Sequence, residues 1–124
     1  MVMKWWSAAP AILAAVGLIA TPAQAHPRMT MSAPAPNVTL RSAPTEIIIG
    51  FNERIIVRFS GLDLRDSHNK KIVTGNASLA PAGNTKVVVP IKQRMLPGTY
   101  RVAWHVVSVD THRISGTYTF KVSR

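Results

Sequence analysis

After residue 25 the hydrophobic residues form a series of short β-like runs, some of which alternate with polar residues at a period of two, and no stretch there has a helical period of useful length. Runs rich in β-branched residues are separated by turns rich in Pro, Gly and Asn. The pattern predicts strands over residues 26–31, 46–52, 54–64, 86–91, 99–109 and 116–122, and polar turns over 66–71 and 81–84.

The last two predicted strands have the clearest alternation. Their apolar side chains share one parity, which comprises Tyr100, Val102, Trp104 and Val106 in one strand and Tyr118, Phe120 and Val122 in the other. One apolar face is typical of half-buried antiparallel strands that pack on a second sheet. The chain is therefore predicted to be all-β, an Ig-like or cupredoxin-like Greek-key sandwich of about seven strands.

Three further features refine this prediction. The run Leu96-Pro97-Gly98-Thr99-Tyr100 predicts a tyrosine corner, in which the Tyr hydroxyl bonds back to the preceding loop. In the segment 54–64, Ile55, Val57 and Phe59 are expected on one face of a strand. In the first strand, Met29 and Met31 share a parity and are expected to pack in the core.

The first 25 residues have the pattern of a signal peptide. Lys4 precedes an apolar run, residues 5–20, and Ala23-Gln24-Ala25 fits a small-x-small cleavage site. The alternative is a membrane anchor, but the run contains Pro10 and is shorter than the roughly 20 residues of a spanning helix. We therefore expect a signal peptide over residues 1–25 and one mature domain over residues 26–124.

The composition narrows the kinds of site and partner. The chain has no cysteine, so it has neither a disulfide nor a thiolate metal site, and metal ligands would be His, carboxylate or Met. Without Lys4, the chain has 14 basic and 5 acidic residues. These basic residues are scattered singly with no interleaved aromatic platform, so nucleic acid is not an expected partner. The charge favours anionic partners or membrane faces.

Cleavage after Ala25 would make His26 the first residue. Its α-amine and ring Nδ1 can then close a chelate ring on one metal ion, which is a copper-type ligand set. Pro27 has no amide N–H, so Cu(II) cannot bind the second backbone nitrogen and must recruit ligands from elsewhere in the fold.

Asp110 and His112 follow the Trp104 strand at a spacing of two. If that strand continues, both side chains lie on one face, where they can meet a metal ion or the carboxylate can orient the imidazole. The alternative is a turn at the strand end in which Asp110 caps backbone amides.

The mature chain resembles the CopC family of periplasmic copper-binding proteins, also called copper resistance protein C. The matching residues are His26-Pro27, Phe51-Asn52-Glu53, the block Leu96-x-Gly98-x-Tyr100-x-Val102-x-Trp104, Ser108-Val109-Asp110-Thr111-His112, Gly116 and Phe120-Lys121-Val122. The resemblance is strongest over the C-terminal quarter and weaker over the rest.

This resemblance implies one Cu(II) per chain, held by the amine and imidazole of His26 together with Asp110 and His112. Glu53 matches an acidic position near that site and is expected to be a supporting carboxylate or weak ligand, the alternative being a turn residue paired with Arg54 or Arg58. Three nitrogens and one oxygen suit a tetragonal Cu(II) ion.

Some members of the family also hold Cu(I) in a methionine-rich loop. Here the corresponding region, residues 64–76, has no methionine, and Met95 is alone in another loop, so a Cu(I) site is not expected. His68 is expected to be a solvated turn residue, and His105, opposite in parity to Trp104, a surface residue.

These features predict an exported, periplasmic and monomeric copper-binding protein rather than an enzyme. Its role would be copper homeostasis or resistance, through buffering, chaperoning or delivery to a CopD-like copper transporter of the inner membrane. Two alternatives belong to other classes: a histidine-brace copper oxidase acting on polysaccharide, and a metal-free structural β-sandwich. Peroxide-dependent turnover of chitin or cellulose would identify the first, and absence of copper binding the second.

Overall fold

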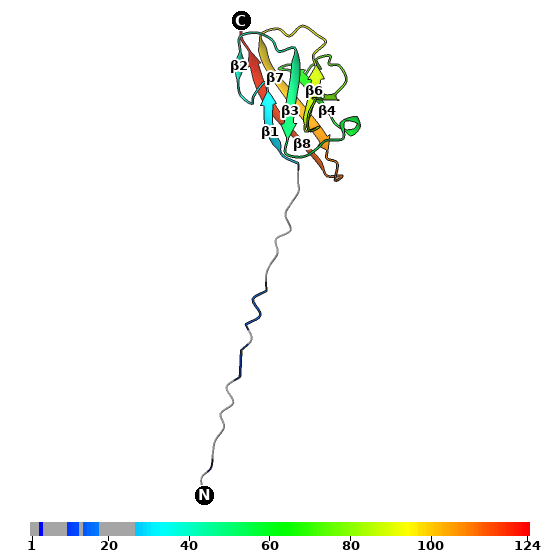
Figure 1. Cartoon of the computed structure of the whole chain (residues 1–124). Helices are drawn as coiled ribbons and strands as arrows, with labels where there is room; N and C mark the ends of the chain where they lie inside the picture. The colour runs from blue at the N-terminus through cyan, green and yellow to red at the C-terminus, as the bar shows by residue number, and fades with distance from the viewer. Residues whose placement is uncertain (1–2, 4–9, 13, 18–26) are drawn as a thin grey trace.

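The computed structural model describes residues 3, 10–12, 14–17 and 27–124 (Figure 1). These residues form one short 3-10 helix, η1 (Val57–Phe59), and eight strands: β1 (Met29–Ala33), β2 (Thr39–Leu40), β3 (Glu46–Phe51), β4 (Gly61–Asp66), β5 (Ser78–Leu79), β6 (Lys86–Pro90), β7 (Gly98–Val107) and β8 (Arg113–Val122). In this part of the chain, no helix is both long and apolar enough to cross a membrane. His26 and the predicted cleavage site lie outside the described residues.

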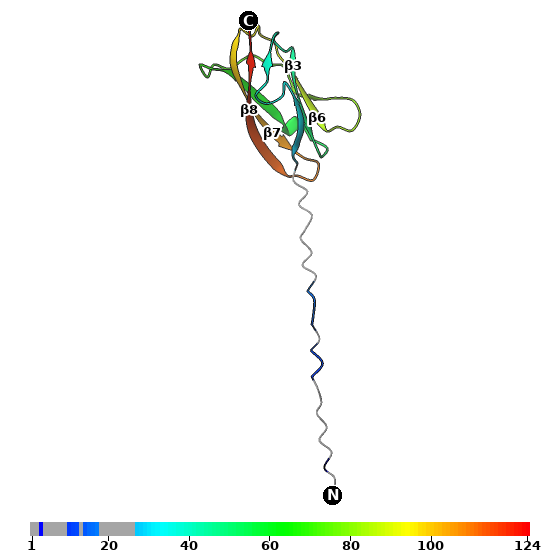
Figure 2. The ribbon, with the colours of Figure 1, turned by 90° about the vertical axis from the view of Figure 1, so that its left-hand side faces the viewer.

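The strands form two four-stranded sheets that pack face to face (Figure 2). One sheet has the order β1-β3-β6-β5 and the other β2-β8-β7-β4. All neighbouring strands pair antiparallel except β2 and β8, which pair parallel. The prediction of an all-β sandwich is confirmed.

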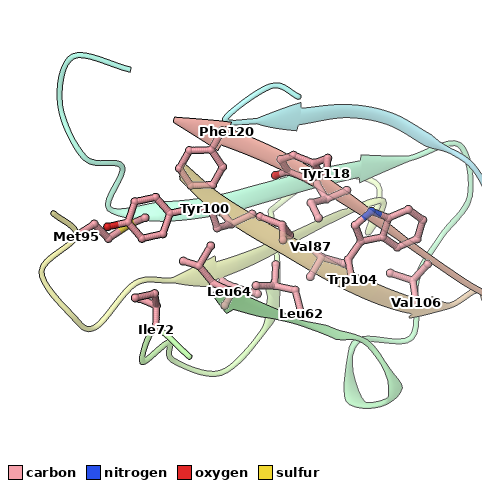
Figure 3. Close-up of a cluster of buried hydrophobic side chains, with 14 of the residues drawn as sticks. Leu62, Leu64, Ile72, Val87, Met95, Tyr100, Trp104, Val106, Tyr118 and Phe120 are labelled. Atoms are coloured by element: carbon pink, nitrogen blue, oxygen red, sulfur yellow. The ribbon is translucent and has the colours of Figure 1, made fainter. Parts of the chain in front are cut away.

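The core lies between the sheets and follows the alternation of β7 and β8. The two strands pair from Gly98 with Val122 to Val107 with Arg113. The side chains of the predicted apolar parity are all buried: Tyr100, Val102, Trp104, Val106, Tyr118, Phe120 and Val122. Figure 3 shows Trp104 and Val106 at one end of this core and Tyr100 with Met95 at the other.

The predicted tyrosine corner is present. The Tyr100 hydroxyl donates a hydrogen bond to the Leu96 carbonyl oxygen, and the Tyr100 ring stacks on Phe120 with ring centroids 5.7 Å apart. This bond ties the loop before β7 to the strand itself. It lies at the end of β7 opposite to residues 108–112.

The expected strand over residues 54–64 is only partly right, because residues 61–64 belong to β4 but the segment before them is not a strand. Ile55 is buried and bridges Ser108, but residues 57–59 form η1 and Phe59 is 49% exposed. The reason is topological, because the chain passes here from β3 in one sheet to β4 in the other. A straight strand cannot make that crossing, so the local alternation is overridden.

The expectation for the first strand is also only partly right. The strand begins at Met29, after Pro27 and Arg28, which are not part of it, and its register shifts between Met29 and Met31. Met29 packs against the core as expected, whereas Met31 is 37% exposed and covers Gly50 on the outer face of the sheet. The irregularity breaks the shared parity, since an extra residue reverses the faces of those beyond it.

Candidate metal centre

The predicted ligands Asp110 and His112 lie in the loop that joins β7 to β8. Strand β7 ends at Val107, so it does not continue through both residues, and of the two alternatives the turn at the strand end is the one present. Instead, the Ser108 N–H donates to the His112 carbonyl oxygen over 2.9 Å, and Thr111 has a φ of 72°. A left-handed conformation is unusual for a β-branched residue and turns the chain back within five residues.

The two side chains nevertheless meet directly. His112 Nδ1 lies 3.0 Å from Asp110 Oδ2, and the Ser108 hydroxyl donates a hydrogen bond to the other oxygen, Oδ1. Ser108 is fully buried, while the Asp110 and His112 side chains are 41% and 45% exposed. The buried hydroxyl therefore holds a carboxylate that is itself open to solvent, and the carboxylate in turn orients the imidazole.

Hydrogen bonding holds the pKa of Asp110 below its usual value. The largest cause is the bond from Ser108. Burial, which acts in the opposite direction, comes second, and the bond from His112, the charge of His112 and Glu53 lower the pKa by smaller amounts. Asp110 is thus an anion over the physiological pH range. A carboxylate and an imidazole in this arrangement can serve as oxygen and nitrogen ligands of a borderline divalent metal ion.

The first described residues of the domain are fixed at this same end of the sandwich. Pro27 is fully buried. The Arg28 N–H donates to Asn52 Oδ1 over 2.6 Å, and the Asn52 N–H donates back to the Arg28 carbonyl oxygen over 3.1 Å. Glu53 follows directly and is one cause of the lowered pKa of Asp110. Figures 1 and 2 both place the start of the described domain beside the β7–β8 hairpin tip.

The sequence reasoning did not assign a role to Ser108 or Asn52. Both lie within the segments that carry the family resemblance, but a serine or asparagine in a loop has no distinctive spacing. Their roles depend on contacts with Asp110 and Arg28, which only the fold supplies.

The remaining predicted residues are placed as follows. No ion pair joins Glu53 to Arg54 or Arg58 in the described part of the chain, where the ion pairs are those of Asp63 and Asp110. His68 and His105 are exposed, as expected. Among residues 27–124 and the few described before them, no three His, Cys, Asp or Glu side chains are grouped to hold a metal ion. Within this part of the chain Asp110 and His112 form a pair and not a complete ligand set.

The fold and this loop define a small β-sandwich with an oriented carboxylate–imidazole pair at one end. The family model of the CopC domain matches residues 29–123, and the chain belongs to the CopC family.

Several relatives are similar over most of their length. Copper resistance protein C from Escherichia coli is 40% identical over 112 residues, which cover 84% of this chain and 86% of that protein. Protein YobA from Escherichia coli strain K12 is 39% identical over 98 residues, 79% of each. The crystal structure of PcoC, a methionine-rich copper resistance protein from Escherichia coli, matches with a TM-score of 0.71 and 32% identity, covering 80% of this chain and 100% of that one.

Proposed function

We propose that the chain is exported, is cut after Ala25, and binds one Cu(II) ion through the amine and imidazole of His26 together with Asp110 and His112. Glu53 acts as a supporting carboxylate beside Asp110. The protein then serves copper homeostasis or resistance in the periplasm, by buffering the ion or delivering it to a CopD-like transporter in the inner membrane.

The observation that carries this proposal is the joint position of two segments far apart in sequence. Pro27 is buried and Arg28 is clamped to Asn52, at the same end as the oriented pair Asp110 and His112. The residue before Pro27 can be at most one Cα–Cα step, about 3.8 Å, from it. This supports a site completed by His26, and the similarity to copper resistance proteins supports copper as the ion.

The test compares His112→Ala with His105→Ala in the mature protein. Loss of His112 should lower Cu(II) affinity by orders of magnitude, because it removes one of the nitrogen ligands. His105 is exposed on β7 outside the proposed site, so its loss should leave the affinity unchanged. Competition with a chromophoric Cu(II) chelator measures both constants. Equal affinities for the two variants would refute the ligand set.

A second test addresses the amino terminus. One extra Gly before His26 removes the α-amine from its chelate ring and should weaken Cu(II) binding as strongly as His112→Ala. Cutting after Ala23 would instead leave His26 third, as in Gln24-Ala25-His26, a local site of one amine, two amides and one imidazole that does not need His112. Intact-mass analysis of the exported protein distinguishes the two cleavage sites.

The same ligand set predicts a pH dependence. Both imidazoles and the amine bind copper only when deprotonated, so protons compete with Cu(II). Affinity should fall steeply as the pH drops through about 6, near the ordinary histidine pKa. An affinity that is flat between about pH 7 and 5 would contradict histidine ligation.

Cu(I) binding is proposed to be weak. Thioether ligands select Cu(I), and residues 64–76 contain none. Met95 is buried in the core, only 6% exposed, rather than presented to solvent. Tight one-to-one binding in competition with a Cu(I) chelator would overturn this part of the proposal.

A binding protein is favoured over a polysaccharide oxidase. An oxidase of that kind needs a flat aromatic face to hold its substrate, whereas Tyr100, Trp104 and Tyr118 are buried in the core. Peroxide-dependent release of oxidised sugars from chitin or cellulose by the copper-loaded protein would reverse this choice.

A further inference from the structure

An apolar and basic surface lies beside the Asp110–His112 loop. It consists of Arg54, Arg58, Phe59, Val109 and Arg113, and is called here the arginine–phenylalanine face. All five residues are exposed, and Phe59 and Val109 are each 49% exposed although both are large and hydrophobic. Exposed apolar side chains that are rimmed by charged residues are typical of surfaces that bind a partner.

The face is held in place by the end of β7. The Ser60 hydroxyl donates to the Ile56 carbonyl oxygen over 2.8 Å and accepts a bond from the Val107 N–H over 3.1 Å, which fixes η1 against the strand. The Val109 N–H donates to the Arg54 carbonyl oxygen over 2.9 Å. The exposure of Phe59 is therefore a property of an anchored turn.

Phe59 also lines a surface pocket. With Val107, Arg113 and Ile114 it lines a pocket of about 410 Å³ on the outer surface of the β7–β8 sheet. The Arg58 guanidinium lies 4.7 Å from the centroid of the Phe59 ring. One arginine therefore lies over the ring and another, Arg113, lines the same pocket, so charged groups can contact anions while the ring contacts hydrocarbon.

The charge of the molecule indicates what kind of partner this face fits. The chain carries 15 basic and 5 acidic residues, and the basic ones are spread over the whole molecule. Salt screens charges beyond about 8–10 Å, so the three arginines of this face are the ones that contact an extended anionic plane, and they can do so together. The two acidic groups at this end, Glu53 and Asp110, are those of the proposed copper site.

We propose that the arginine–phenylalanine face binds the surface of an anionic phospholipid bilayer. Phe59 enters at the level of the headgroups, with Val109 beside it, and Arg54, Arg58 and Arg113 contact lipid phosphates. This orientation brings the Asp110–His112 loop to the membrane surface. The inference adds to the proposed function a place of action, and its test needs no copper, so failure of one does not imply failure of the other.

The experiment is co-sedimentation of the exported, processed protein with vesicles. Vesicles of phosphatidylcholine mixed with phosphatidylglycerol should bind it, and vesicles of phosphatidylcholine alone should bind it weakly. Phe59→Ser should lower the partition coefficient roughly tenfold, because a half-exposed phenylalanine loses its burial in the bilayer. Arg58→Gln and Arg113→Gln should each lower it about fivefold.

The far end of the molecule offers matched controls. Leu96 is 61% exposed in the loop before β7, and Arg94 is exposed beside it. Leu96→Ser and Arg94→Gln change hydrophobicity and charge as the test variants do, and should leave binding almost unchanged. If they weaken it as much as Phe59→Ser and Arg58→Gln, the attraction comes from net charge alone and the proposal is wrong.

A spectroscopic readout guards against a folding defect in Phe59→Ser. The fluorescence of Phe59→Trp should shift to the blue on binding to anionic vesicles, whereas that of Leu96→Trp should not. No binding to pure lipid vesicles would overturn the proposal. Binding only to native membranes, lost after trypsin treatment of those membranes, would also overturn it and would identify a membrane protein as the partner.

Discussion

Ser108 shows how one buried hydroxyl can set the chemistry of an exposed loop. It donates a hydrogen bond to Asp110, and Asp110 contacts His112. These contacts connect the buried core to a side chain that is open to solvent. Ser108→Ala should lower Cu(II) affinity about 10- to 100-fold, the usual effect of losing a group that orients a metal ligand. Ser115→Ala, an exposed serine on β8, is the control and should have no effect.

The same variant has a consequence for the metal-free protein. Because Ser108 is the largest cause of the low pKa of Asp110, Ser108→Ala should raise that pKa toward its ordinary value. In the wild type the lowered pKa stabilises the fold above about pH 4, and this contribution is lost as the pH falls through the folded-state pKa. NMR titration of the Asp110 carboxyl carbon measures the shift. An identical midpoint in both proteins would contradict the role of the hydroxyl.

The two tyrosines of the core should respond oppositely to loss of the hydroxyl. Tyr100→Phe removes a hydrogen bond to Leu96 and should lower the free energy of unfolding by about 1 kcal/mol. The Tyr118 hydroxyl is buried beside the Ser32 hydroxyl, yet neither completes a hydrogen bond of good geometry within the described residues. Tyr118→Phe should therefore be neutral or stabilising. Chemical denaturation at neutral pH compares them, and equal losses would refute the distinction.

Tyr118 is also expected to make the stability of the fold depend on pH in the alkaline range. Burial raises its pKa, an effect that Ser32 only partly offsets. The folded state then holds the phenolic proton more tightly than the unfolded chain. The resulting stability is complete below about pH 10, the ordinary tyrosine pKa, and is lost as the pH rises through the folded-state value. Denaturation measured at increasing pH should show a shallower loss for Tyr118→Phe.

Among the elements, the β7–β8 hairpin contributes side chains to the core and its connecting loop holds the candidate site. The middle of the hairpin is tightly packed. A Cβ on Gly116 would lie 2.5 Å from the Trp104 ring, which packs edge-on against Phe51 with ring centroids 5.3 Å apart. Gly116→Ala should cost about 1–3 kcal/mol, because the indole must move in a packed core. Urea unfolding followed through Trp104 fluorescence measures this cost.

Gly61 provides the control for that prediction on the neighbouring strand β4. A Cβ there would lie 3.4 Å from Cε1 of His105, whose ring is exposed and can move. Gly61→Ala should be near neutral or slightly stabilising, since alanine loses less backbone entropy than glycine on folding. Equal destabilisation by the two substitutions would show that the Trp104 contact is not the cause.

For the whole molecule, the proposed ligands lie near opposite ends of the mature sequence and would meet only in the folded state. Cu(II) should therefore bind the native protein far more tightly than the unfolded chain. At a free concentration about 100 times the dissociation constant it should stabilise the fold by about 2.7 kcal/mol. Thermal unfolding with increasing Cu(II) measures this effect, which a chelator should reverse. His112→Ala should abolish it, and a shift that persists in that variant would indicate a local site.

The sequence by itself determined which strands form the core and which residues are candidates for chemistry. Alternation in residues 99–107 and 116–122 is set by the two-residue period of a strand with one buried face, so it can be read without a structure. The predicted ligand residues Asp110 and His112 were also found from sequence, through their spacing and the family resemblance.

Only the tertiary structure decided how these pieces meet. The crossing between sheets, which is a property of topology, converted the alternating segment around Phe59 into a turn with an exposed ring. A positive φ at Thr111 replaced strand geometry with a tight loop, so Asp110 and His112 touch for a reason different from the one their spacing suggested. The bond from Ser108 and the clamp of Asn52 on Arg28 join atoms whose proximity depends on the closed sandwich, and local patterns of hydrophobicity contain no information about such contacts.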